Sequence, residues 1–117
     1  MPRTKHARFD CAPGCSVEAT LQFIDGKWKG VILFHLLSGP LRFNELRRKL
    51  PNVTQRTLTN QLRELEQDGI VSRKIYAVIP PKVEYSLTVW GRTLRPVIRA
   101  LKTWGDDFLN RGAKAAS

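Results

Sequence analysis

The amino-acid sequence predicts a mainly α-helical domain that carries one small β-hairpin. Three observations support this fold class. Apolar residues recur at helical spacing along most of the chain, and 42% of the 117 residues are hydrophobic. Two short strand-like runs, the second of which alternates apolar and polar residues, flank a loop that contains Pro80 and Pro81. A chain of this length and content forms one domain with its own core.

The charge of the chain is strongly positive. Twenty Lys and Arg residues against ten Asp and Glu residues give a net charge of +10. This excess favours an anionic partner, such as nucleic acid or an acidic membrane surface. No apolar run approaches the roughly 18 residues of a membrane span, so we expect a cytoplasmic protein without a membrane partner. Two cysteines are too few for a disulfide framework and indicate thiols in a reducing compartment.

The two ends of the chain differ in composition from the centre. Residues 1–14 contain four basic side chains with two prolines and a glycine, which predicts a flexible basic arm. A solvated arm is the simpler interpretation, and an arm that touches the DNA backbone is the alternative. Residues 15–112 are expected to form the folded domain, and residues 113–117 a disordered tail.

Two helices are predicted in the first third of the domain. Ser16 begins the first, Gly26 ends it, and Val17, Leu21 and Ile24 form an apolar stripe. Residues 27–37 are apolar on nearly every side, which is typical of a helix surrounded by protein. This segment should be the central helix. It contains His35, which has no partner at metal spacing, so neither a metal site nor another cofactor is expected.

A short helix and a longer one follow, joined by a tight link. The segment from Phe43 to Leu50 turns its apolar residues inward and its basic residues outward, and Pro51 stops it. Thr54 can then cap a second helix that Gly69 closes. Two short helices with a tight turn between them are the organisation of a helix-turn-helix.

The second of these helices has two distinct faces. Leu58, Leu62 and Leu65 form one stripe, and polar residues lie opposite it or on its flank: Arg56, Thr59, Asn60 and Arg63. Arg and Asn match the edges of guanine and adenine, and Thr, Gln and Arg also reach phosphates. Taken alone, such a face is more often an ordinary solvated surface, so its neighbours in the sequence decide the interpretation.

The hairpin after Gly69 is basic. Residues 71–76 and 83–87 read as strands, and Pro80 and Pro81 belong in the loop because proline cannot donate ladder hydrogen bonds. Lys74 lies on the first strand and Lys82 beside the prolines. A basic hairpin directly after a recognition helix is a wing; a solvent hairpin that covers the core is the alternative.

The final segment is long and aromatic. Thr88 can cap it, Pro96 must start, kink or split it, and apolar residues from Trp90 to Phe108 recur at helical spacing. A single small domain rarely needs so long a stripe for its own core. Part of it should therefore pack against a second subunit, with a fold-back onto the same chain as the alternative.

Four sequence blocks resemble the HxlR type of bacterial transcriptional regulator, a relative of the MarR group with a winged helix-turn-helix. They are GKW at residues 26–28, RF..L at residues 42–46, L..L..L..DG at residues 58–69 and PP..EYSLT at residues 80–88. The resemblance covers Cys15 to about Trp104. Val89 and Trp90 depart from it, because the family usually has polar or small residues there. An indole at that point could widen a pocket or an interface.

The resemblance implies a homodimer formed by the first and last helices, with two recognition helices in successive major grooves of a pseudo-palindromic operator. By position, it implies that the helix after Thr54 reads bases and nearby phosphates, that the basic run from Arg42 anchors the DNA backbone, and that two lysines serve the wing. The candidate DNA-binding residues are Arg42, Lys49, Thr54, Gln55, Arg56, Thr59, Asn60, Arg63, Lys74 and Lys82.

Cys15 occupies the position, just before the first helix, where many family members carry a cysteine. Some members use it to sense oxidants, quinones or aldehydes, so a small electrophile or oxidant is a candidate effector. The positive end of the helix dipole favours the thiolate at such a position. Cys11 could act as the second thiol. That both thiols are inert is the alternative, and a metal site of His6, Cys11 and Cys15 is a weaker one.

Taken together, these features predict a sequence-specific DNA-binding regulator, most simply a repressor, that performs no catalysis. A thiol-dependent redox enzyme would need a CxxC pair or an activating His and Arg cluster, and the sequence contains neither spacing. A nonspecific DNA-binding protein would fit the charge but gives no purpose to the wing and the capped helix.

Overall fold

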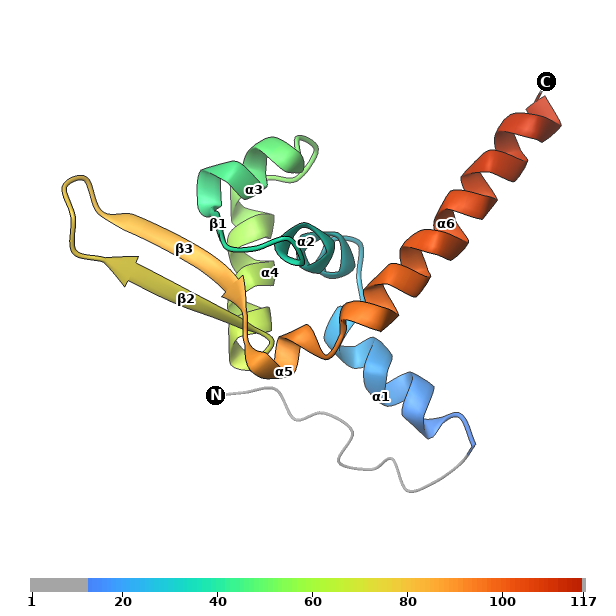
Figure 1. The fold of residues 1–117 in the computed structure, drawn as a ribbon, viewed down its shortest axis with the longest axis horizontal. Coiled ribbons are helices and arrows are strands. Elements are labelled where there is room, and N and C mark those ends of the chain that lie inside the picture. Colours follow the sequence, from blue (N-terminus) through green and yellow to red (C-terminus); the bar gives the residue numbers. More distant parts are fainter. Residues whose placement is uncertain (1–12, 117) are drawn as a thin grey trace.

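The computed structural model describes residues 13–116, in which helices are joined to one small sheet (Figure 1). The predicted basic arm, with Cys11, lies largely outside this range. The elements in chain order are α1 (Cys15–Ile24), α2 (Lys29–Leu36), β1 (Leu41–Arg42), α3 (Phe43–Lys49), α4 (Gln55–Gln67), β2 (Val71–Tyr76), β3 (Lys82–Leu87), α5 (Val89–Arg92) and α6 (Arg95–Ala116). The mainly helical fold class with a small sheet is thereby confirmed.

Helix α2 lies at the centre of the domain, as predicted. It contacts α1, α3, α4, α6 and β3, and its Ile32, Leu33 and Leu36 are buried. The expectation that protein surrounds this helix on nearly every side is wrong for the chain alone. Val31 and Phe34 remain at least 36% exposed, because no element formed by residues 13–116 covers that side of α2.

The sheet contains one strand more than the predicted hairpin. Its order is β1-β3-β2 and both pairings are antiparallel, with Arg42 opposite Glu84 and Glu84 opposite Lys74. The two residues of β1 are too few to show an alternating pattern, so their pairing could not be read from the sequence. Lys82, which the sequence suggested for the loop, is the first residue of β3.

The last segment is split into two helices, one of the outcomes expected from Pro96. The Thr88 hydroxyl accepts a hydrogen bond from the Gly91 amide at 2.9 Å and caps α5. Pro96 is the second residue of α6, where its missing amide hydrogen costs nothing. Helix α6 extends to Ala116, so residues 113–116 belong to the helix and not to a disordered tail. Three of these four residues are alanines, which have the highest helix propensity.

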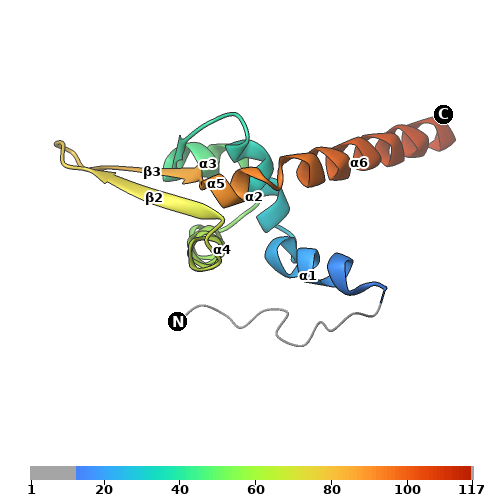
Figure 2. The ribbon, with the colours of Figure 1, turned by 60° about the horizontal axis from the view of Figure 1, so that its bottom comes forward.

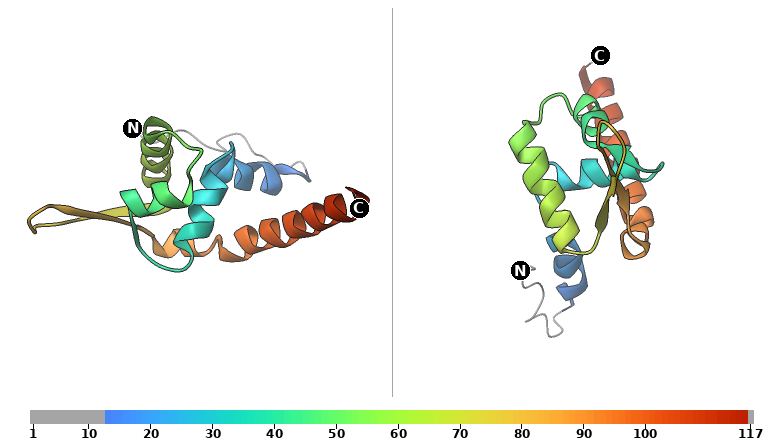
Figure 3. Two further views of the ribbon diagram at one scale, coloured as in Figure 1. Left: turned by 90° about the horizontal axis from the view of Figure 1, so that it is seen from above. Right: turned by 90° about the vertical axis from the view of Figure 1, so that its left-hand side faces the viewer.

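The elements are arranged in two halves that extend in opposite directions. The sheet, α3 and α4 form one half, and α1 and α6 extend from the other (Figures 1 and 2). Seen along the hairpin, α4 and the hairpin face the viewer and α6 lies behind them (Figure 3, right). Among the described residues, no helix has the length and hydropathy required to cross a membrane.

Candidate nucleic-acid interface

Helix α4 is fixed at both ends and along one side. At its start the Thr54 oxygen accepts a hydrogen bond from the Thr57 amide at 3.0 Å, which is the predicted cap. After its end, Gly69 adopts a φ of 76°, a left-handed conformation that closes the helix. Leu58, Leu62 and Leu65 are no more than 1% exposed. These leucines therefore hold one side of the helix against the core and turn its polar side outward.

The outward side of α4 carries the predicted reading residues. Gln55, Arg56, Asn60 and Arg63 are exposed. Thr59 is half-buried, and its hydroxyl donates to the Gln55 carbonyl oxygen at 2.8 Å, which leaves its oxygen free to accept only. The Thr54 hydroxyl likewise donates to the Thr57 hydroxyl oxygen at 2.9 Å. The long side chains of this face are thus the stronger candidates for contacts with bases.

Helix α3 precedes α4 and presents a basic end. Arg47, Arg48 and Lys49 lie exposed in its last turn, where positive charges interact favourably with the helix dipole. At the start of α3, a Glu45 carboxylate oxygen accepts a hydrogen bond from the Arg42 amide at 2.8 Å. Arg42 and Lys49, both predicted as backbone anchors, therefore stand at opposite ends of one short helix.

His35 lies half-buried in the last turn of α2. Burial lowers the pKa of His35, and the positive charge of Lys49 lowers this pKa further. The ring of His35 packs edge-on against Phe34, with the ring centroids 5.2 Å apart. Among residues 13–116, no group of three or more His, Cys, Asp or Glu side chains could hold a metal ion. His6 and Cys11 of the alternative metal site lie outside the described residues.

The wing carries two lysines, Lys74 and Lys82, on one face of the sheet. The ammonium groups of Lys74 and Lys82 lie 4.8 and 4.9 Å from the centre of the Tyr76 ring. The Tyr76 hydroxyl donates to a Glu84 oxygen at 3.0 Å, and the Lys82 ammonium lies 3.3 Å from the other oxygen of this carboxylate. The strand register places these side chains opposite the face that buries Tyr85 and Leu87.

Glu84 is the acidic member of this cluster, and its surroundings favour its ionised form. The hydrogen bond from Tyr76 is the main cause that lowers the pKa of Glu84, and Lys82 and the charge of Arg42 lower it further. One carboxylate is therefore set among three cations, Arg42, Lys74 and Lys82, and the outer face of the sheet keeps a positive charge. The sequence analysis did not single out Glu84, although its place between Val83 and Tyr85 already indicated the outer face.

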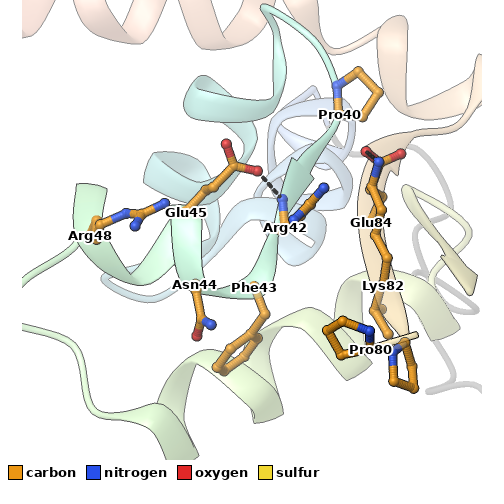
Figure 4. A pocket seen from close by; sticks show the side chains of 11 residues that line it. Pro40, Arg42, Phe43, Asn44, Glu45, Arg48, Pro80, Lys82 and Glu84 are labelled. Atoms are coloured by element: carbon orange, nitrogen blue, oxygen red, sulfur yellow. Dashed lines mark hydrogen bonds and ion pairs between the residues drawn. The ribbon is translucent and has the colours of Figure 1, made fainter. Parts of the chain in front are cut away.

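A cleft of about 850 Å³ separates α3 from the tip of the wing (Figure 4). Side chains from α3, β3 and the loop between the strands surround it, and it brings together Arg42 and Lys82, which lie far apart in the sequence. Arg48 also lines the cleft, as do Pro80 and Pro81. Two carboxylates, Glu45 and Glu84, line the same cleft. Its three cations leave a small positive excess, which is suited to an extended polyanion.

An ion pair connects the base of the wing to α4. The Arg73 guanidinium nitrogen lies 3.7 Å from a Glu66 carboxylate oxygen. Tyr85 lies next to this pair, and its pKa is raised by burial and by the charge of Glu66. The wing and the recognition helix are consequently held together by charge as well as by the apolar core. The sequence analysis assigned no role to Glu66.

Cys15 is the first residue of α1 and follows the capping residue Gly14. Its side chain is half-buried, and α1 leads away from α4 and the wing (Figure 1). The predicted position at a helix start is confirmed to within one residue, since the helix was expected to begin at Ser16. Cys11, the predicted second thiol, lies outside the described residues.

Trp90, the departure from the family pattern, lines an apolar pocket of about 360 Å³ together with Phe23, Leu94 and Val97. Its indole is also 58% exposed. Of the two roles suggested by the sequence, the pocket is therefore present in the single chain. A covered interface would need a second molecule.

Comparison with solved structures supports the class that the fold and the polar helix face define. The chain superposes on a structure titled "Redox regulator HypR in its oxidized form" with a TM-score of 0.77 and 58% identity, over 80% of this chain and 96% of that one. It also matches the reduced form of the transcriptional regulator YodB from B. subtilis, with a TM-score of 0.70 and 33% identity, over 85% and 95% of the two chains. The protein is a winged helix-turn-helix transcriptional regulator.

The family follows from the sequence comparison. Residues 23–113 match the model of the HxlR-like helix-turn-helix. The uncharacterized HTH-type transcriptional regulator YdeP of Bacillus subtilis (strain 168) is 58% identical over 98 residues, which are 84% of this chain and 77% of the relative. A second regulator of that organism, YybR, is 59% identical over 94 residues, or 80% and 75% of the two chains. The chain belongs to the HxlR family.

Proposed function

We propose that this regulator binds a pseudo-palindromic operator as a homodimer and represses a nearby promoter. The observation that carries the proposal is the exposed polar face of α4, set between a basic α3 and a basic wing and fixed by a buried leucine stripe. In a winged helix-turn-helix dimer, the two recognition helices enter successive major grooves about 34 Å apart. Arg56, Asn60 and Arg63 are the proposed base-reading residues.

The homodimer is supported by apolar side chains that the single chain leaves uncovered. Val17 and Leu21 of α1 are exposed, and so are several large residues of α6: Leu101, Trp104, Phe108 and Leu109. The Trp104 and Phe108 rings stack with centroids 6.0 Å apart and are 70% and 61% exposed. An exposed apolar surface of this kind marks an interface, and a C2 dimer would bury it twice.

The test of DNA recognition begins by selecting bound sequences from a random DNA library with the purified protein. The expected result is a site with two inverted halves and an affinity that falls steeply as salt concentration rises, because bound phosphates release counterions. Equal affinity for selected and random DNA would instead support the nonspecific binding protein. A flat salt dependence would contradict both forms of DNA binding.

The dimer can be tested separately with Trp104→Ala/Phe108→Ala. Analytical ultracentrifugation should detect a dimer for the wild-type protein and a monomer for the double variant. The double variant should also bind the selected DNA with lower affinity. The exposed Thr103→Ala on the same helix is the matched control. A variant that remains dimeric would place the interface elsewhere.

We further propose that oxidation of Cys15 controls DNA binding. Two similar structures support this, an oxidized form of the redox regulator HypR and a diamide-treated YodB from B. subtilis. Diamide accepts two electrons and two protons from two thiols, which join as a disulfide. The second thiol is either Cys15 of a partner subunit or Cys11. A non-reducing gel separates these cases, since the first gives a covalent dimer and the second leaves a monomer band.

Footprinting with and without diamide tests this control on DNA. The wild-type protein should lose or shift its footprint, while Cys15→Ser should keep it under both conditions. A footprint that responds equally in Cys15→Ser would contradict thiol control through this residue. The proposal contains no catalytic step, and peroxide turnover with a thiol reductant, lost in Cys15→Ser, would favour the redox enzyme instead.

A further inference from the structure

Lys29 is the one buried charged or polar residue among residues 13–116 for which the structure gives burial. It is the first residue of α2, and its side chain is 2% exposed. Its ammonium group donates a hydrogen bond to a Glu64 carboxylate oxygen at 2.7 Å. Asp25, which caps the end of α1, lies at 3.7 Å and is largely exposed. The close partner of this buried charge is thus a residue of the recognition helix.

The pair is buried at Lys29, whereas the Glu64 side chain stays 33% exposed, and an ion pair with a buried member contributes little to net stability. Removing two charges from water is costly, and their attraction roughly offsets that cost. Replacing such a pair by apolar residues of similar size is often neutral or stabilising. The best-supported use of buried charged pairs is to fix one arrangement among several that would pack equally well. The ion pair between Lys29 and Glu64 is therefore suited to fixing the orientation of α4 relative to α2.

The leucine stripe of α4 leaves such an orientation to be fixed. Hydrophobic burial is non-directional, so Leu58, Leu62 and Leu65 hold the helix against the core but resist small rolls about its axis only weakly. A short hydrogen bond to a charged group has a defined length and direction. The contact from Lys29 to Glu64 therefore restricts the roll of α4.

The ion pair acts next to the reading face. Glu64 follows Asn60 by four residues, so the two are neighbours on the helix surface. Glu64 also directly follows Arg63. A roll that lengthened the contact with Lys29 would move both of these side chains relative to the DNA, whereas the basic residues of α3 and the wing would stay in place.

We propose that Lys29 is a positioning residue for DNA recognition: through its ion pair with Glu64 it sets the roll of α4 and thereby the discrimination between operator and other DNA. This inference rests on the proposed function, because it assumes that the exposed face of α4 reads bases. It assigns no contact with DNA to Lys29 itself, which is buried.

The test compares wild-type protein with Glu64→Gln, Lys29→Met and Lys29→Met/Glu64→Leu. Each is titrated with the DNA selected by the wild-type protein and with a scrambled duplex of the same length and composition. Thermal unfolding and the salt dependence of binding are measured for the same proteins. Glu64→Gln keeps the size of the side chain and removes only the charge, so it tests the proposal even if Lys29→Met does not fold.

The expected result is a fall of roughly tenfold in the ratio of the two affinities for each single variant, with no further fall in the double variant. The midpoint of thermal unfolding of the double variant should not fall, and the salt dependence should not change, since no phosphate contact is lost. Removing the Lys102 and Asp106 pair of α6, which has the same 2.7 Å distance but is half exposed, should leave the ratio unchanged.

Two results would overturn the inference. One is a double variant that discriminates as well as the wild-type protein. The other is a proportional loss of affinity for both duplexes together with a lower unfolding midpoint, which would give the pair a merely structural role. If instead the wild-type protein selected no sequence at all, the proposed function would fail first, and the inference with it.

Discussion

The Thr88 hydroxyl donates a hydrogen bond of 2.6 Å to the carbonyl oxygen of Gly69, the residue that closes the recognition helix. The Thr88 hydroxyl oxygen also accepts a hydrogen bond from the Gly91 amide, and the Thr88 amide donates to the Ile70 carbonyl oxygen at 3.0 Å. One residue thus joins the end of α4, the end of β3 and the start of α5. The base of the wing is closed at this point.

Replacing Thr88 by valine should destabilise the domain, because valine has a similar shape but neither donor nor acceptor. Loss of the helix cap alone costs about 1 kcal/mol, and the unpaired Gly69 carbonyl adds to that figure. Urea unfolding measures the change. Thr103→Val, on the exposed surface of α6, is the control and should cost much less. Equal losses of unfolding free energy for the two variants would show that the hydrogen bonds of Thr88 do not stabilise the domain.

Gly91 should tolerate no side chain. A β-carbon at this position would overlap the Ile70 carbonyl oxygen, which is backbone and cannot turn aside. Gly91→Ala is therefore expected to lower the unfolding temperature. Gly105→Ala in α6 meets open space in the single chain and should raise it slightly, since alanine in a helix interior is favoured over glycine by about 1 kcal/mol. Differential scanning calorimetry measures both changes in unfolding temperature, which should be negative for Gly91→Ala and positive for Gly105→Ala.

The roles assigned to α4 and the wing predict two different binding phenotypes. Asn60→Ala or Arg56→Ala should relax the sequence preference by roughly 1 to 3 kcal/mol at one base pair. Lys82→Ala should weaken binding to all sequences alike and lower the salt slope by about one unit, because it removes one phosphate contact. Titrations against selected DNA and single-base variants separate these effects. The same phenotype for both groups would refute this division of roles.

Glu84 should make stability depend on pH in the acid range. Its pKa is lowered in the folded chain from an ordinary value of 4.5, first by the hydrogen bond from Tyr76. A carboxyl group with a lowered folded pKa stabilises the fold above its unfolded pKa, and this contribution is lost as the pH falls through the folded pKa. Wild-type protein should therefore be more stable than Glu84→Gln at neutral pH and should lose that advantage below pH 4.5.

The measurement is the difference in unfolding midpoint between the two proteins across a pH series. Tyr76→Phe removes the main cause of the lowered pKa and should reduce the pH dependence of wild-type stability. An advantage that persisted unchanged at low pH would show that Glu84 acts through packing, not through its charge.

Much of the recognition unit could be predicted from the sequence because its signals are local. Thr54 caps α4, Gly69 closes it, and Leu58 to Leu65 are buried at helical spacing. The strand from Val71 to Tyr76 was predicted with the observed bounds, because Gly69 before it and the proline-rich loop after it mark its ends. Such features depend on residues a few positions apart.

The elements that were missed depend on residues far apart in the sequence. Strand β1 exists because Leu41 pairs with Tyr85, and two residues carry no pattern of their own. The same holds for the cleft between α3 and the wing and for the contact between Lys29 and Glu64, which are 35 positions apart. No local rule distinguishes a buried lysine from a solvated one.

By itself, the sequence determined the order of the helices and strands, the polar face of α4 and the excess of positive charge, since caps, periodicity and composition are properties of neighbouring residues. Only the tertiary structure decided which charges meet. It set Glu84 among three cations of the sheet, Arg42, Lys74 and Lys82, and placed Lys29 in the interior against Glu64. The physical reason is that the energy of a charge depends on its burial and its partners, and both arise only when distant segments pack together.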